Sequence, residues 1–165
     1  MTFGSPRSWR SSSGLWWRTD KFSYTAYQEM DNDGRETGVV IRGPKHVSKL
    51  GMFAFCWPGC LTVMYDREVV GLIQIADIKK NNDYTMWLKI CQKADCYLLD
   101  EVLAKYRRGR VGSISTHGYS TMVKWHYKLW HKAMGKNFLA SLFWTCTNLV
   151  CGVYKKLFYV KKISK

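Results

Sequence analysis

Residues 105–165 contain no Asp or Glu, although they hold half of the 26 Lys and Arg residues of the chain. Residues 31–104, by contrast, carry nine basic and ten acidic side chains and are close to neutral. The basic segment cannot neutralise its charge by local ion pairs, so water, the balanced middle of the chain or a bound polyanion must relieve the repulsion. We expect a bound polyanion. The alternative is a lysine face that is simply solvated.

Length and composition favour one compact domain with a packed core. The chain has 165 residues, of which 47% are hydrophobic and 15% aromatic. That apolar content is too high for a chain that is disordered throughout, and the length is too short for two full-sized domains. The formal net charge of +14 again points to an anionic partner.

Residues 1–20 predict a flexible basic and aromatic arm that precedes a single α+β domain over 21–165. Ser and Gly residues interrupt every apolar run of the arm, so it does not resemble a secretory signal peptide. We therefore expect an intracellular location, in cytoplasm or nucleus, with membrane association open. Arm residues that could contact a polyanion are Arg7, Arg10, Arg18, Trp16 and Trp17.

The fold class expected from the pattern is α+β, with a small antiparallel sheet in the middle of the chain and helices after it. Apolar runs between Gly and Pro turns predict strands at 37–42 and 50–55, and a hairpin of 60–65 with 69–76. The Asp-Asn-Asp-Gly run at 31–34 predicts a turn rather than a calcium loop. Periodicity then predicts a strand at 84–91, a helix at 93–107, a short strand at 111–116 and a helix from Ser120 or Thr121 to about Gly135.

Four lysines spaced four residues apart predict a cationic stripe on that last helix. Successive steps of four advance about 400° along an α-helix, so the ammonium groups share one side of it. Neighbouring tryptophans would add stacking or interfacial burial. The predicted phosphate-binding residues are Arg107, Arg108, Arg110, Lys124, Lys128, Lys132, Lys136, Lys155, Lys156, Trp125 and Trp130.

The segment 137–154 is uncharged and lies between Lys136 and the pair Lys155 and Lys156. Its length approaches the roughly 20 residues that span a bilayer, but Asn148 near its centre is unfavourable in hydrocarbon. A buried hairpin or core helix is the commoner explanation, and a helix in the headgroup plane is intermediate. Residues 155–165, with paired lysines around four apolar residues, predict a protected edge strand.

Six cysteines fall into the pairs Cys56/Cys60, Cys91/Cys96 and Cys146/Cys151. No pair has Cys-x-x-Cys spacing, so we expect reduced, buried thiols rather than disulfides. A zinc site built from Cys56, Cys60 and His117 or Cys91/Cys96 is a minor alternative. We expect no metal and no cofactor.

No complete catalytic or phosphate-loop motif occurs in the chain, and the prediction is a protein that is not an enzyme. In size and composition the chain is similar to small basic matrix, capsid or movement proteins of viruses, such as rhabdovirus matrix proteins. This resemblance implies a structural or packaging protein of the virion that self-associates and binds nucleic acid, RNA or DNA, and an anionic membrane surface. The alternative is a membrane-anchored accessory or movement-type protein that uses 137–154 as its membrane segment.

Overall fold

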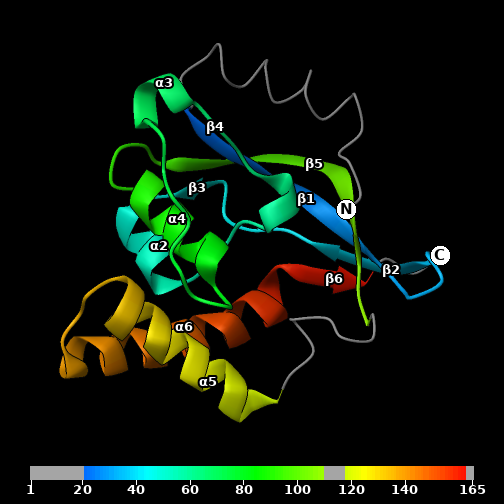
Figure 1. The fold of residues 1–165 in the computed structure, drawn as a ribbon. Helices are drawn as coiled ribbons and strands as arrows, with labels where there is room; N and C mark the ends of the chain where they lie inside the picture. The colour runs from blue at the N-terminus through cyan, green and yellow to red at the C-terminus, as the bar shows by residue number, and fades with distance from the viewer. Residues whose placement is uncertain (1–20, 110–117, 163–165) are drawn as a thin grey trace.

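The computed structural model describes residues 21–109 and 118–162 and has an α+β fold with a mixed sheet, as expected for the fold class (Figure 1). Its elements are β1 (Phe22–Met30), β2 (Glu36–Ile41), β3 (His46–Val47), α2 (Lys49–Ala54), the 3-10 turn η1 (Cys60–Thr62), β4 (Met64–Tyr65), α3 (Arg67–Val70), α4 (Asn82–Ile90), β5 (Cys96–Arg107), α5 (Tyr119–Lys128), the π-helical turn η2 (Leu129–Ala133), α6 (Phe138–Phe158) and β6 (Val160–Lys162).

The sheet is organised around the long strands β1 and β5. Its strand order is β3-β5-β1-β2-β6, and β4 pairs with the first residues of β1. β1 and β5 run parallel, with Ser23 opposite Tyr97 and Met30 opposite Arg107, while the other pairings are antiparallel. A parallel pair needs a long crossover, which here contains α2, α3 and α4. The predicted purely antiparallel sheet is therefore wrong in this respect.

Four predicted elements have the opposite secondary structure or do not form. Of the strand predicted at 50–55, residues 50–54 belong to helix α2, whose first turn is capped by the Ser48 hydroxyl accepting from Gly51 N. The hairpin of 60–65 with 69–76 is absent, because Asp66 caps helix α3 and β4 pairs with β1 instead. Residues 84–91 form helix α4 and residues 93–107 contribute strand β5, which reverses both predictions.

Other local predictions are confirmed. The strand at 37–42 corresponds to β2, and the turn at 31–34 ends on Gly34, which has a φ of +84° that glycine accepts without strain. The helix predicted from Ser120 to Gly135 corresponds to α5 followed by η2. Of the edge strand predicted at 155–165, only Val160–Lys162 form a strand among the described residues: they are β6, which pairs with β2 at the edge of the sheet, whereas 155–158 belong to helix α6. The predicted arm at 1–20 and strand at 111–116 lie outside the described residues.

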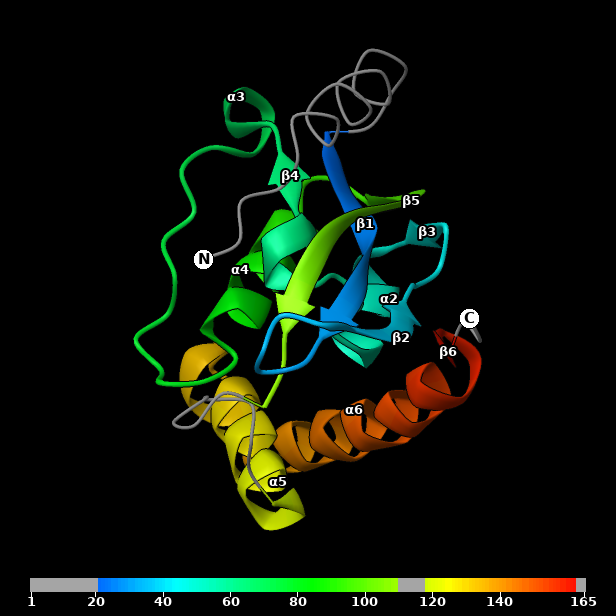
Figure 2. The same cartoon turned by 90° about the vertical axis from the view of Figure 1, so that its right-hand side faces the viewer.

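Helices α5 and α6 lie together on one side of the sheet and its crossover helices (Figure 2). Leu129 and Trp130 of η2 are fully buried in the core, where they join Met52 of α2 and Tyr84 and Leu88 of α4. None of the helices among residues 21–109 and 118–162 is both long and apolar enough to span a bilayer. The segment 137–154 is helical, but it packs along the domain.

Candidate functional site

A partly buried carboxylate lies where the crossover enters α4. Asp83 is the second residue of that helix, and its Oδ1 accepts a hydrogen bond of 2.8 Å from Tyr84 N. Other partly buried carboxylates are engaged: Asp66 caps α3 and pairs with Lys21, Asp95 pairs with His46, and Glu29 with Arg108. Asp83 has no cationic partner among the residues that the structure describes. Asp31 also lacks one, but its Oδ1 accepts from two backbone amides, Asp33 N and Arg35 N. Asp83 is therefore a candidate to accept a proton from a bound molecule.

The backbone that precedes Asp83 is held in an uncommon conformation. Asn81 has φ +58° and ψ +20°, and it is the one non-glycine residue with positive φ in the described part of the chain. Its Nδ2 is buried and has no hydrogen-bond partner there. Left-handed backbone in a non-glycine residue and an unsatisfied buried donor both concentrate at functional sites. The segment 81–83 is thus a candidate site by geometry.

The loop Cys56–Cys60 lies within electrostatic range of the Asp83 carboxylate. Burial raises the pKa of the Cys56 and Cys60 thiols, and the negative charge of Asp83 raises both further. Gly59 lets this loop approach β1, because a Cβ there would lie 2.8 Å from the Tyr27 ring. The site therefore combines a carboxylate, two thiols with raised pKa and the amides of Asn81 and Asn82.

Lys155 of α6 fixes the same loop from its other side. Its Nζ donates to Trp57 O at 2.7 Å and to Cys56 O at 3.4 Å, and it lies 5.3 Å from the Phe55 ring centroid. Burial lowers the pKa of this ammonium to about 8. Lys155 thus positions the loop and is not a free surface charge.

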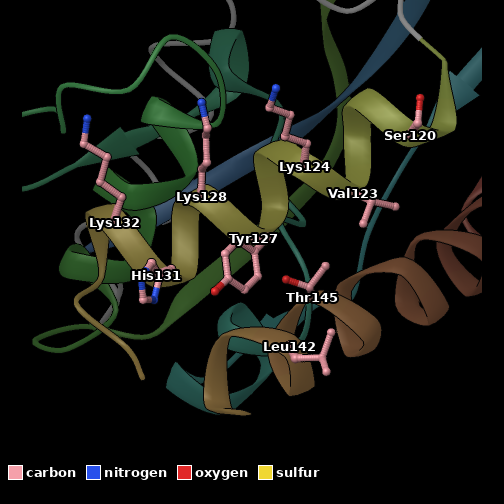
Figure 3. A pocket seen from close by; sticks show the side chains of 9 residues that line it. All are labelled: Ser120, Val123, Lys124, Tyr127, Lys128, His131, Lys132, Leu142 and Thr145. Carbon is pink, nitrogen blue, oxygen red and sulfur yellow. The ribbon is translucent and has the colours of Figure 1, made fainter. Parts of the chain in front are cut away.

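A second candidate is an open groove of about 800 Å³ between α5 and α6. Val123, Tyr127 and Leu142 form part of its apolar lining. Figure 3 shows the side chains of Lys124, Lys128 and Lys132 projecting together from α5 and η2 and pointing away from α6. The predicted cationic stripe therefore exists for these three lysines. Lys136 does not continue it, because it follows the π-helical turn and its Nζ lies 5.9 Å from the Phe53 ring centroid.

Two predicted contact residues are unavailable at the surface. Trp130 is 0% exposed, and its Nε1 donates to Asn148 Oδ1 at 3.0 Å, so it cannot stack on a ligand. Lys155 is committed to the loop carbonyls. Trp125 remains half-buried under the Lys128 ammonium at 4.8 Å, and Lys156 and Arg107 are exposed. Arg110, Arg7, Arg10, Arg18, Trp16 and Trp17 lie outside the described residues.

Part of the positive charge is neutralised within the fold. Arg108 contacts Glu29 at 3.0 Å, and Lys105 contacts Glu36 at 2.6 Å. Both pairs join the start of the basic segment to carboxylates of strands β1 and β2. Other described basic side chains of this segment belong to several elements: α5, η2, α6 and β6.

The cysteines are all reduced thiols, of which Cys91 and Cys96 are buried whereas Cys60 and Cys146 are exposed. Burial raises the pKa of Cys91 to about 12. Among residues 21–109 and 118–162, no three His, Cys, Asp or Glu side chains converge in a way that could hold a metal ion. The zinc alternative has no support from this part of the chain.

Asp83 and its neighbours were missed at the level of sequence. Asn81, Asn82 and Asp83 stand immediately before an apolar segment, which is a helix-start signal. The assignment of 84–91 as a strand hid that signal. A correct helix would have placed a carboxylate in its first turn.

Two curated glycosyltransferases are similar to the chain. TuaG of Bacillus subtilis (strain 168), named for a glycosyltransferase step of teichuronic acid biosynthesis, is 36% identical over 91 residues, which are 54% of this chain and 36% of TuaG. WfaP of Escherichia coli, named UDP-Glc:alpha-D-GlcNAc-diphosphoundecaprenol beta-1,3-glucosyltransferase, is 30% identical over 103 residues, which are 62% of this chain and 40% of WfaP. The chain thus spans well under half the length of these relatives. No family model matches the chain, and no solved structure matches it.

These similarities overturn the predicted function. Both relatives are named as enzymes of sugar transfer, so a non-enzymatic viral matrix or packaging protein that binds nucleic acid is wrong. The prediction that the chain is not an enzyme is contradicted by the same finding. The error has a physical origin, since surplus positive charge reports an anionic environment but not its identity.

Proposed function

We propose that the protein acts in glycosyl transfer, moving a sugar from a nucleoside diphosphate sugar to an acceptor hydroxyl. The observation that supports this is the similarity to two relatives that share the activity while their names differ in pathway and organism. Because the aligned segments are 36% and 40% of those relatives, the activity of a whole enzyme, its donor and its acceptor are all part of the proposal.

Asp83 is the proposed general base. In the transfer, the acceptor oxygen forms a bond to C1 of the donor sugar while the bond from C1 to the diphosphate oxygen breaks. The nucleoside diphosphate leaves with the electron pair, and the acceptor proton passes to the Asp83 carboxylate. Its Oδ1 is held by Tyr84 N, which orients the group without neutralising it. The nearby Asn81 and Asn82 amides provide donors and acceptors for sugar hydroxyls.

The proposed acceptor is a sugar carried on a lipid diphosphate, as in the printed name of WfaP. Such an acceptor is anionic and apolar at once, which matches a protein with surplus lysines and exposed apolar helix surface. Nucleoside diphosphate sugars are intracellular metabolites, so the proposal retains an intracellular location for the reaction.

The test measures release of UDP from UDP-glucose in the presence and absence of a synthetic GlcNAc-diphosphate lipid. Asp83→Asn keeps an oxygen to accept from Tyr84 N but removes the base, and it should lower the rate by about 100-fold or more. Asp77→Asn is the matched control, because Asp77 is an exposed carboxylate in the same crossover. Acceptor-independent UDP release, or equal rates for the two variants, would overturn the assignment. Absence of any transfer by the wild-type protein would overturn the proposed function.

A further inference from the structure

Helix α6 has its polar side chains inside and its apolar side chains outside. The buried residues of this 21-residue helix are Ser141, Thr145 and Asn148. Large apolar side chains that are 47–74% exposed cover much of the remaining surface of the helix: Phe138, Leu139, Leu142, Phe143, Val150, Val153, Tyr154, Leu157 and Phe158. A surface helix of a soluble globular protein normally buries its apolar side chains and exposes its polar ones.

These apolar side chains form one continuous face. Leu139, Leu142, Phe143, Cys146, Val150, Val153 and Leu157 recur at spacings of one, three or four residues, so they fall within one broad sector of the helix. No charged residue occurs between Lys136 and Lys155. The face extends about 30 Å at 1.5 Å per residue, which exceeds the apolar patches that isolated soluble proteins usually expose.

The charges around this face are positive. Lys136 precedes α6, while Lys156, Lys161 and Lys162 are exposed at its other end. No Asp or Glu follows Glu101 in the chain, so no carboxylate of this segment offsets these lysines. Two copies stacked through this face in antiparallel fashion would bring Lys136 of each beside the Lys156 end of the other, which is repulsive. An anionic surface is the complementary partner.

We infer that the outward face of α6 docks onto an anionic lipid bilayer, with the helix lying in the headgroup region and its terminal lysines contacting lipid phosphates. An amphipathic helix with an apolar face and flanking lysines binds in this orientation, and its long lysine stems reach the phosphates from an apolar position. No described helix can span the bilayer, which agrees with attachment at the surface. The α4 site would then be held close to a lipid-linked acceptor.

The test is co-sedimentation of the full chain with vesicles of phosphatidylcholine alone and of phosphatidylcholine with one quarter phosphatidylglycerol, without any sugar donor. Wild-type protein should bind the anionic vesicles, more weakly at high salt. The triple variant Leu139→Gln, Val150→Gln and Leu157→Gln should bind about tenfold or more weakly. The matched control is Leu50→Gln with Leu72→Gln, at residues 67% and 72% exposed on α2 and in the crossover. The salt-sensitive part of vesicle binding should fall in a variant that combines Lys156→Gln, Lys161→Gln and Lys162→Gln. A variant with Lys45→Gln and Lys49→Gln serves as the control for lost charge.

Equal binding by the α6 variant and the Leu50/Leu72 control would overturn the inference. The inference would also be overturned if the wild-type protein failed to bind vesicles but formed a concentration-dependent dimer that the α6 variant abolishes. A second copy of the chain would then cover the face. A second readout needs no apolar substitution: an environment-sensitive fluorophore on Cys146, in a Cys60→Ser background, should shift to the blue on anionic vesicles. An unchanged emission spectrum would equally refute docking. Vesicle binding without glycosyl transfer would leave this inference standing and remove only the proposed activity.

Discussion

Asn148 is the polar residue on which the attachment of α6 depends. Its Nδ2 donates to Phe53 O at 2.8 Å and to Ala54 O at 2.7 Å, at the end of α2. Its Oδ1 accepts from Trp130 Nε1 at 3.0 Å and from His126 Nδ1 at 3.2 Å. One side chain thus joins α6 to α2, α5 and η2, and it is 1% exposed.

Asn148→Leu keeps the size of the side chain but removes these four hydrogen bonds and a fifth, which Nδ2 donates to Tyr84 Oη at 3.4 Å. The buried Trp130 N–H and the Ala54 carbonyl lose the partner that this amide provides, at about 1–3 kcal/mol each. We therefore expect the free energy of unfolding to fall by about 4 kcal/mol. With a urea dependence of about 2 kcal/mol per molar, the unfolding midpoint should move down by about 2 M.

Urea titration followed by tryptophan fluorescence and by circular dichroism measures this change. Thr147→Val is the matched control, because the Thr147 hydroxyl donates only within its own helix, to Phe143 O at 3.0 Å, and this variant should change stability by about 0.5 kcal/mol or less. Trp130→Phe removes the donor that Asn148→Leu leaves unpaired, so the double variant should cost clearly less than the sum of the singles. A loss below about 1 kcal/mol, or strict additivity, would refute the role given to Asn148.

Three further predictions follow from buried titratable groups. Burial lowers the pKa of Lys155 from 10.5 to about 8, so the folded protein gains stability as pH rises from about 8 to 10.5 and this lysine loses its proton. Lys155→Met removes the buried charge. In urea titrations its stability relative to wild type should therefore be higher at pH 7 than at pH 10. Burial also lowers the pKa of His126 below 6.5, so lowering the pH should destabilise the wild type more than His126→Gln. Thermal melts at pH 5 and pH 7 measure this difference. An equal fall in melting temperature for the two proteins would contradict the prediction. Iodoacetamide should modify exposed Cys60 and Cys146 before Cys91 and Cys96, because burial shields the latter two thiols and raises the pKa of both. Peptide mass spectrometry measures the order of labelling. Early labelling of Cys96 would contradict the prediction and show that the core is open.

The sequence predicted the elements whose signals are local. The turn ending at Gly34, the strand β2 and the helix after Gly118 depend on turn residues and short periodic runs, and all three are present. Strand β5 was mistaken for a helix because Ala94, Leu98 and Val102 recur every four residues, and because acidic residues precede basic ones, as suits a helix dipole. In the structure Lys105 reaches across the sheet to Glu36. Only tertiary pairing distinguishes these alternatives.

The prediction for residues 84–91, most of which belong to helix α4, was wrong for a different reason. Tyr84, Thr85, Trp87, Leu88 and Ile90 are all buried, so the helix is enclosed on most sides. A helix that is apolar nearly all round lacks the single stripe by which helices are recognised. The error also removed Asp83 from consideration, since its position in the first turn depends on the helix. The lysine stripe, which needs only a spacing of four, was found for Lys124, Lys128 and Lys132.

The buried side of α6 holds the helix on the domain, whereas its outer side is the proposed membrane-binding face. Asn148 and Lys155 attach the helix through polar contacts, whereas Leu139, Val150 and Leu157 project outward and are 70% exposed or more. Removing apolar side chains that are mostly in water costs little folding free energy, because little apolar area returns to solvent on unfolding. We therefore expect the triple variant of the outer face to unfold at the wild-type urea midpoint while it loses vesicle binding. A large drop in its midpoint would show that these side chains are packed in solution, and that α6 is held to the domain by its apolar face after all.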